Sequence, residues 1–479
     1  MPTSYFIGLD LGTTSAKACA FDSTGKLLTE RIAHYPLAHP EPGAAVQDPA
    51  VMVEKTADIL ASVIAGTSGE CRSIAISTAM HGVLLLDEAY EPLGPIITWA
   101  DVRAQSVLPL PPPSPLRPRP NEAGKLSLAE LTGTPIHPMS PLVKLRWLTD
   151  HHPERLRAAT YFGDLKTYLI NRWTTAGHVL DEQLASATGL LDVATGEWAA
   201  AALHAAGQDD DAAYRVKFPK VVPVTTQLEW RPEIAAEFGA QNIPLFIGGS
   251  DGCLANIGSG LLTPGHAAVT IGTSGAVRIT HRQARPDYHG QTLFNYRIKD
   301  DYFALGGASN NGGKAIEWIY ELLSAHFEDI GDLLTRAAAH ETDLVFRPFL
   351  NGERAPAWDA TATAAFENLR GHHGPLDLAR AVLDGVTKNI CTILRHVEAA
   401  SGPVRRIYAS GGFTRSPEWL QLLADYSGRE VVVASTPQAS AYGAALVGRL
   451  AVTAGATLTD IAPDVSLQTA SVVYSPTAK

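Results

Sequence analysis

Residues 5–22 read YFIGLDLGTTSAKACAFD, and this stretch decides the fold that the sequence predicts. Apolar residues alternate up to Asp10, the chain turns through residues 12–15, and the alternation then resumes, which is typical of a β-hairpin. The turn offers backbone N–H groups and three hydroxyl donors to an anion, from Thr13, Thr14 and Ser15. Asp10 would face the same anion through a Mg²⁺ ion. We therefore expect this hairpin to bind a metal-bound phosphate.

A second hairpin of the same design occurs half a chain later. Residues 267–280 read AAVTIGTSGAVRIT, in which one apolar strand enters a turn at Gly272 and Thr273 and another strand leaves it. One such turn would be unremarkable by itself. Two hairpins of one design predict two similar domains that face each other across a nucleotide.

Two glycine-rich segments of the second half are further candidates for nucleotide contacts. Residues 407–416 form a strand, a double glycine and the start of a helix, an arrangement in which backbone can lie flat against a nucleotide. Residues 306–313 are expected to form a loop that opens a helix running to Leu323, and such a loop either wraps a nucleotide or simply connects two elements. The candidates in these segments are Gly307, Asn311, Gly411 and Gly412.

The composition is that of a globular protein with more than one domain. The length of 479 residues predicts two to three domains, with 46% hydrophobic and 18% charged residues. A net charge of −11 argues against nucleic acid or an anionic membrane as the main partner. The four cysteines have no paired spacing, so neither a zinc site nor a disulfide framework is indicated. No leader or membrane-spanning run is recognised, which predicts a cytoplasmic protein. The oligomeric state stays open, a homodimer included.

Candidate binding residues follow two strands of the first half, at the strand ends where open α/β sheets present binding groups. Met80 and His81 follow one strand, and Trp99, Asp101 and Arg103 follow the other. Trp99 would cover the apolar face of a sugar, Asp101 would accept hydroxyl hydrogens, and Arg103 would hold a carboxylate. Each residue also has a structural interpretation: Trp99 as core, Asp101 with Arg103 as a solvated ion pair, and His81 as a turn histidine.

The boundary between the two domains is predicted at Pro244, which divides the chain into residues 1–243 and 244–479. A buried strand at 245–247 then leads into the sequence GGSDG. An aspartate among glycines at the end of a strand is exposed and leaves space for a ligand. Asp251 is therefore our candidate for a catalytic base. The alternative is that Asp251 only caps the helix that follows.

In this order, the segments resemble the FGGY family of carbohydrate kinases over nearly the whole chain, and within that family the gluconate kinase branch. Residues 139–147, MSPLVKLRW, match the family's first signature, and residues 364–384 follow the spacing of its second. The branch is indicated by residues 77–81, 97–101, 132–142, 185–189 and 352–356.

The resemblance implies the two-domain α/β fold of actin and hexokinase, a ribonuclease H-like fold with ATP and Mg²⁺ in the cleft between the domains. It implies ATP-dependent phosphorylation of a sugar acid, most simply D-gluconate to 6-phosphogluconate, with Asp251 as general base. It also implies the following roles: Asp10 for Mg²⁺; Thr13, Thr14, Gly272 and Thr273 for the phosphates; Gly411 and Gly412 for adenosine; Met80, His81, Trp99 and Asp101 for the sugar.

Two departures from the family pattern and two alternatives accompany this interpretation. A proline-rich run at 108–120 replaces a charged helix and predicts an extended segment or an exposed loop. Asn368 stands where the second signature usually has glycine, and asparagine tolerates a left-handed backbone. One alternative is a kinase for xylulose or another polyol. The other is an actin-like nucleotide-binding ATPase or regulatory protein without sugar kinase activity.

Overall fold

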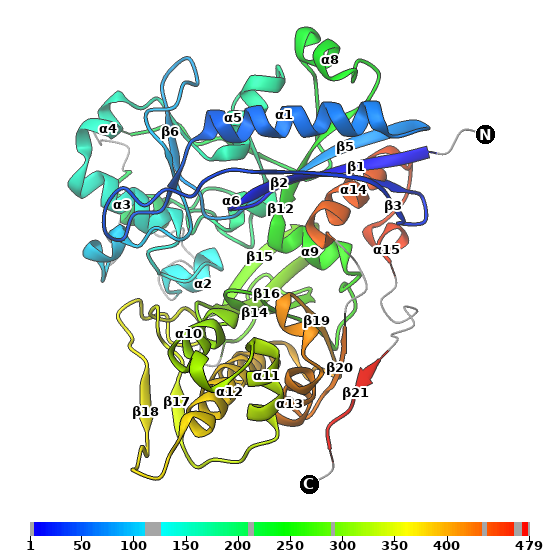
Figure 1. The fold of residues 1–479 in the computed structure, drawn as a ribbon. Helices are drawn as coiled ribbons and strands as arrows, with labels where there is room; N and C mark the ends of the chain where they lie inside the picture. Colours follow the sequence, from blue (N-terminus) through cyan, green and yellow to red (C-terminus); the bar gives the residue numbers. More distant parts are fainter. Residues whose placement is uncertain are drawn as a thin grey trace.

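The computed structural model describes residues 4–110, 126–208, 215–288, 293–433, 438–463 and 472–477. The chain forms two α/β halves, each built on one large mixed sheet (Figure 1), which confirms the predicted fold class. Residues 111–120 of the proline-rich run lie outside the described ranges. Among the helices of those ranges, none combines the length and the apolar character needed to cross a membrane.

The first sheet has the strand order β11-β12-β5-β1-β2-β3. The predicted hairpin is its centre, because β1 pairs with β2 antiparallel and ends with Leu11 opposite Ala16. β1 also pairs with β5, and β5 with β12, in parallel, so these three strands end at the same edge. The strands are β1 (Ser4–Leu11), β2 (Ser15–Asp22), β3 (Leu27–His34), β5 (Glu70–Thr78), β11 (Gln227–Leu228) and β12 (Leu245–Ser250).

The second sheet repeats the design in the order β15-β16-β14-β13-β19-β20-β21. Its hairpin pairs β13 with β14 antiparallel, as predicted, and β13 runs parallel to β19. The strands are β13 (His266–Ile271), β14 (Gly275–His281), β15 (Phe294–Lys299), β16 (Tyr302–Ser309), β19 (Arg406–Ser410), β20 (Glu430–Val433) and β21 (Val473–Tyr474). The expected loop at 306–313 is wrong in its first part, because residues 306–309 continue β16.

Helices cover both sheets. In the first half they are α1 (Pro49–Gly66), α2 (Leu128–Thr132), α3 (Pro141–His151), α4 (Pro153–Ala158), α5 (Leu165–Trp173), α6 (Glu182–Ser186), α7 (Ala200–Ala205), α8 (Pro232–Phe238) and α9 (Asp251–Gly258). In the second half they are α10 (Gly313–Leu323), α11 (Ile330–Ala338), α12 (Pro375–Ser401), α13 (Pro417–Ser427), α14 (Ala439–Val452) and α15 (Leu458–Ile461).

Short elements complete the fold. The two-stranded pairs use β4 (Val46–Gln47), β6 (Leu84–Leu86), β7 (Ile96–Ile97), β8 (Tyr161–Gly163), β9 (Val179–Asp181), β10 (Lys220–Val222), β17 (Val345–Arg347) and β18 (Ala365–Glu367). Three 3₁₀ turns span Arg103–Val107, Ser324–His326 and Gly412–Arg415. Asn368, just after β18, has φ of 65°, the left-handed backbone that its place in the sequence predicts.

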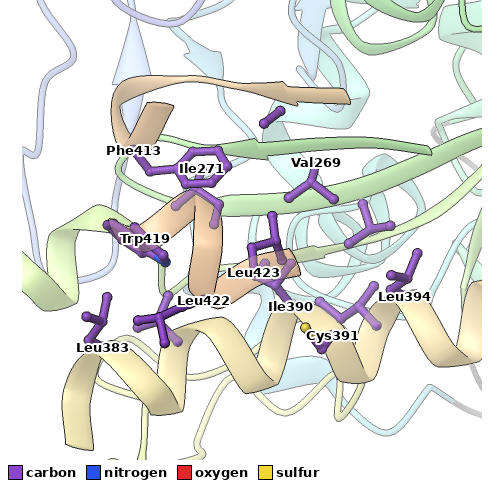
Figure 2. Close-up of a cluster of buried hydrophobic side chains, with 14 of the residues drawn as sticks. Val269, Ile271, Leu383, Ile390, Cys391, Leu394, Phe413, Trp419, Leu422 and Leu423 are labelled. Atoms are coloured by element: carbon purple, nitrogen blue, oxygen red, sulfur yellow. The ribbon is translucent and has the colours of Figure 1, made fainter. Parts of the chain in front are cut away.

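The core of the second half lies between α12, α13 and the sheet (Figure 2). The long apolar stripe of α12 was predicted from its helical spacing, and Ile390 of that stripe is fully buried. Trp419 of α13 packs against α12 and donates its Nε1 hydrogen to Thr387 Oγ1 of that helix at 2.9 Å. A buried indole N–H needs such an acceptor, so this contact fixes α13 against α12.

The end of the chain returns to the first half, where α14 packs against β1, β5 and α9. β12 also belongs to the first sheet. The predicted boundary at Pro244 is therefore too early: the first sheet extends to Ser250, and the segment after 244 does not form one separate unit. The sequence could not reveal this, because a buried parallel strand has the same apolar character in either half.

Gly443 makes the close packing of α14 testable. A Cβ atom there would lie 1.9 Å from the carbonyl oxygen of Leu254 in α9, a backbone atom that cannot rotate away. We expect Gly443→Ala to reduce the free energy of unfolding by about 3 kcal/mol, the upper part of the range for overpacked cores. Urea denaturation followed by circular dichroism measures this change.

The matched control is Gly371→Ala, where an added Cβ meets no atom within 4 Å and the backbone is not left-handed. The control should unfold at the parent midpoint. Equal midpoints for both variants would contradict the packing described for α14.

Candidate active site

Two carboxylates meet where the parallel strands of the first sheet end. Asp10 lies near the end of β1, and Asp251 follows the end of β12. Ser77 of β5 donates a hydrogen bond of 2.7 Å from its Oγ to Asp10 Oδ1. Burial raises the pKa of Asp10, while Ser77 and Lys17 oppose that rise. The sheet topology thus brings together two acidic groups that are 241 residues apart, as a Mg²⁺ and phosphate site requires.

Asp251 is the first residue of α9. The helix cap is Ser250, whose Oγ accepts a hydrogen bond from the backbone N–H of Cys253 at 3.4 Å. The residue that caps α9 is therefore Ser250, and not Asp251 as the structural alternative had proposed. Burial and the nearby charge of Asp10 raise the pKa of Asp251 to about 6, and Arg278 is the main group that opposes this rise. An acid with such a pKa is ionised at neutral pH and still basic enough to accept a proton.

Lys166 holds the strands that carry this site, and the sequence analysis did not identify it. Its fully buried ammonium donates to the carbonyl oxygens of Gly249 at 2.7 Å and Ile76 at 3.2 Å, and it pairs with Asp181 at 2.9 Å. These contacts tie the end of β12 to β5 just before Asp251. A lysine in an amphipathic helix usually suggests exposure, so only the tertiary contacts reveal its role.

The two predicted phosphate turns are both formed. In the first, Gly12 N–H bonds to Ser15 O at 3.0 Å, Thr14 is exposed, and Thr13 accepts a hydrogen bond of 2.9 Å from Trp99 Nε1 at its Oγ1. In the second turn, Gly272 N–H bonds to Ser274 O at 2.9 Å. Trp99 is thereby fixed against the phosphate turn of its own half.

Gly411 and Gly412 follow β19 beside the second turn, and both are exposed. Gly411 has φ of 98°, and a Cβ there would lie 2.5 Å from Ile271 O. This close approach of β13 explains why the chain needs glycine at 411. The exposed backbone of the pair stays available to a ligand at the edge of the sheet.

Gly307 and Asn311 were predicted to contact a nucleotide. Gly307 lies within β16, where an added Cβ would meet Ala355 and Ile393 at 2.7 Å, so its role is close packing. Asn311 is 1% exposed and donates from Nδ2 to Gly352 O at 2.8 Å. Gly307 thus packs inside the strand and Asn311 supports the loop from inside, and their contacts with a nucleotide stay predictions.

His81 and Met80 were predicted to contact the sugar, and the structure shows how the His81 turn is held. His81 has φ of 66°, and its Nδ1 lies 2.8 Å from Ala187 O. The buried Lys144 donates from Nζ to the carbonyl oxygens of His81 and Met139, both at 2.7 Å. These bonds hold the His81 turn in its strained conformation, which places the imidazole between the halves, with Nε2 3.5 Å from Tyr296 Oη of β15.

Asp101 and Arg103 use their charges within the protein. Asp101 is 1% exposed; it accepts hydrogen bonds from Ala45 N–H at 3.0 Å and from Arg103 Nη2 at 2.7 Å. Arg103 also pairs with Glu41 and lies over the Trp147 ring. Both groups thus brace the segment before β4, and their expected contacts with a hydroxyl and with a carboxylate stay predictions.

Arg354 joins the two halves and was not proposed as a ligand contact. Its guanidinium carbon lies 5.1 Å from the centre of the Trp99 ring, and its Nη2 donates to Ser309 O at 3.1 Å. The sequence signal was the polar GERAP turn at 352–356, which indicated only the family branch. Arg354 thus places a stacked guanidinium beside Trp99 that, unlike Arg103, has no carboxylate partner among the described residues.

The chain is similar in sequence and in fold to several carbohydrate kinases. The chain is 36% identical over 462 residues to a gluconokinase of Bacillus subtilis, covering 93% of this chain and 87% of that protein. The crystal structure of gluconate kinase from Lactobacillus acidophilus has a TM-score of 0.87 at 29% identity, covering 99% of this chain and 94% of that one. A ligand-bound xylulose kinase from the same organism has a TM-score of 0.88 at 30% identity, with the same coverage.

Two family models match successive parts of the chain. The N-terminal domain model of the FGGY carbohydrate kinases matches residues 5–258, which includes β12 and α9, and the C-terminal domain model matches residues 267–452. Together they span most of the chain, including both phosphate turns and Asp251. The protein therefore belongs to the FGGY family of carbohydrate kinases.

Proposed function

We propose that this kinase transfers the γ-phosphoryl group of ATP to the 6-hydroxyl of D-gluconate, giving 6-phosphogluconate and ADP. The observation that carries the proposal is Asp251, a carboxyl with a pKa of about 6, near Asp10 at the ends of two parallel strands of the first sheet. The identity of 36% with a gluconokinase supports gluconate as the substrate.

Asp251 would act on the hydroxyl that is phosphorylated. It orients the O–H group and accepts its proton while the hydroxyl oxygen forms a bond to the γ-phosphorus and the bond to the ADP oxygen breaks. The sugar would lie between His81 and Trp99, whose positions are fixed by Lys144 and Thr13 respectively. Positioning of the two reactants therefore supplies much of the rate.

The phosphate turns and Asp10 would hold the nucleotide. Asp10 keeps one carboxylate oxygen free of Ser77, and its charge raises the pKa of Asp251, so a divalent cation beside them would relieve their repulsion. These residues fit Mg²⁺, with Asp10 as its protein ligand. When bound, Mg²⁺ neutralises charge on the phosphates. Gly411 and Gly412 would lie against the adenosine.

A panel of acceptors tests the substrate. ATP consumption should be measured with gluconate, xylulose, ribulose, glycerol and other sugar acids at equal concentrations. We expect gluconate to have the highest kcat/KM. The xylulose kinase is an equally close structural neighbour, and preference for a neutral sugar would overturn gluconate while keeping the kinase. ATP hydrolysis that no acceptor stimulates would favour the ATPase alternative.

Asp251→Asn tests the general base. The amide keeps the size of the side chain and cannot accept the proton, so we expect kcat to fall by about 10²- to 10⁴-fold. The Kd for gluconate, measured by titration calorimetry, should change by less than about threefold. Near-normal turnover would exclude Asp251 as the base.

The acid limb of the pH profile follows from the raised pKa of Asp251. The base is active when ionised, so kcat/KM for gluconate should fall below pH 6, by about tenfold per unit at lower pH. Initial rates from pH 5 to 8 at limiting Mg²⁺ give the midpoint, because a cation bound beside Asp10 would lower it. A profile that stays flat down to pH 5 would contradict the assigned pKa.

A further inference from the structure

Several basic side chains converge on the sugar side of the site. Lys144, His137 and Arg354 all lie close enough to His81 for their charges to lower its pKa, and Arg278 acts on Arg354 in the same way. Within the ranges that the structure describes, neither Arg278 nor Arg354 forms an ion pair with a carboxylate. The carboxylates of Glu353 and Asp251 act on Arg354 and Arg278 through their charge only, so neither guanidinium has a carboxylate bound to it.

Arg354 has donors that the protein does not use. Its Nε is buried without a hydrogen-bond partner. The neighbouring carboxylate of Glu353 is occupied instead by Ser309 Oγ at 2.7 Å, Asn310 N–H at 2.8 Å and Asn389 Nδ2 at 2.9 Å. Burial is the main cause that lowers the pKa of Arg354 to about 10. An unpaired buried guanidinium is costly unless a ligand completes its hydrogen bonds.

His137 presents a second unused donor beside Arg354. It is 3% exposed, and its Nδ1 accepts a hydrogen bond from Met139 N–H at 3.2 Å. The ring proton of the neutral imidazole must then sit on Nε2, which has no partner. Burial and the charge of Arg354 keep the ring neutral, with a pKa of about 3. Two unmet N–H donors in a positive environment are complementary to an anion.

We propose that Arg354 and His137 bind the carboxylate of the sugar acid, in the field of Arg278 and Lys144, while the hydroxyl at the other end of the substrate meets Asp251. This proposal rests on the proposed function and names the residues that would make the enzyme prefer a sugar acid to a neutral sugar. A guanidinium matches a carboxylate with two parallel hydrogen bonds, and stacking on Trp99 fixes the plane in which it does so. In this proposal Arg354, and not Arg103, binds the carboxylate of the substrate.

The test compares binding of gluconate with binding of glucitol, in which a CH₂OH group replaces the carboxylate, in the absence of nucleotide. We expect Arg354→Gln to raise the Kd for gluconate about 30-fold or more, because truncation leaves a charge without its partner. His137→Phe retains an aromatic ring beside Trp358 and should raise the same Kd by about tenfold, the effect of one hydrogen bond to a charged group. Affinity for glucitol should change less than about threefold in both.

The matched control is Arg347→Gln, which removes the same charge from an exposed pair with Glu367 on β17 and should leave both affinities unchanged. Thermal unfolding of each variant confirms that it is folded. An equal loss of gluconate and glucitol affinity would overturn the carboxylate site, and so would a rise in KM for ATP without a change in the gluconate Kd.

Failure of this site and failure of the proposed function give different results. If the parent enzyme phosphorylates gluconate and Arg354→Gln and His137→Phe both leave its Kd unchanged, the function stands and the carboxylate site is wrong. If the parent prefers a neutral sugar in turnover while sugar acids still bind through Arg354, the substrate is wrong and the site stands.

Discussion

The site depends on the ion pair and hydrogen bonds of the buried Lys166 ammonium, which hold the strands that carry it. Removing both Lys166 and Asp181 from water is costly, and the pair is tolerated only because further hydrogen bonds satisfy it. The lysine also bonds to Gly249 and Ile76, and the aspartate caps α6 through the N–H groups of residues 183 and 184. Gln183 in α6 then bonds to Ser250 N–H and, across the interface, to Ile298 O. One polar chain thus runs from α5 to the second half and passes directly before Asp251.

The site that this chain holds is divided by charge. Asp10 and Asp251 form its acidic side, where in the proposed reaction a hydroxyl would lose its proton and a cation would meet phosphate. Arg354 and His137 form its basic side, where the other end of a sugar acid would sit. A substrate with one anionic end and one neutral end would therefore bind with its anionic end toward Arg354 and His137 and away from the two carboxylates.

The sequence predicted what depends on local pattern. Both hairpins, the stripe of α12 and the left-handed backbone of Asn368 follow from alternation, helical spacing and residue type, and each is confirmed. The tertiary partners of a side chain could not be predicted in this way. Arg103 is occupied by Asp101 and Glu41, Gly307 packs inside β16, and Lys166 is buried in a helix whose sequence suggests exposure. Residue type does not show whether a charged side chain binds a ligand or a neighbouring residue, so only the tertiary contacts show which partner it has.

A crystal structure with gluconate and a non-hydrolysable ATP analogue would test the account most directly. The account predicts the 6-hydroxyl within hydrogen-bond distance of Asp251 and the carboxylate bound to Arg354, with the γ-phosphate between the two turns. A reversed sugar, with its carboxylate toward Asp10 and Asp251, would contradict it.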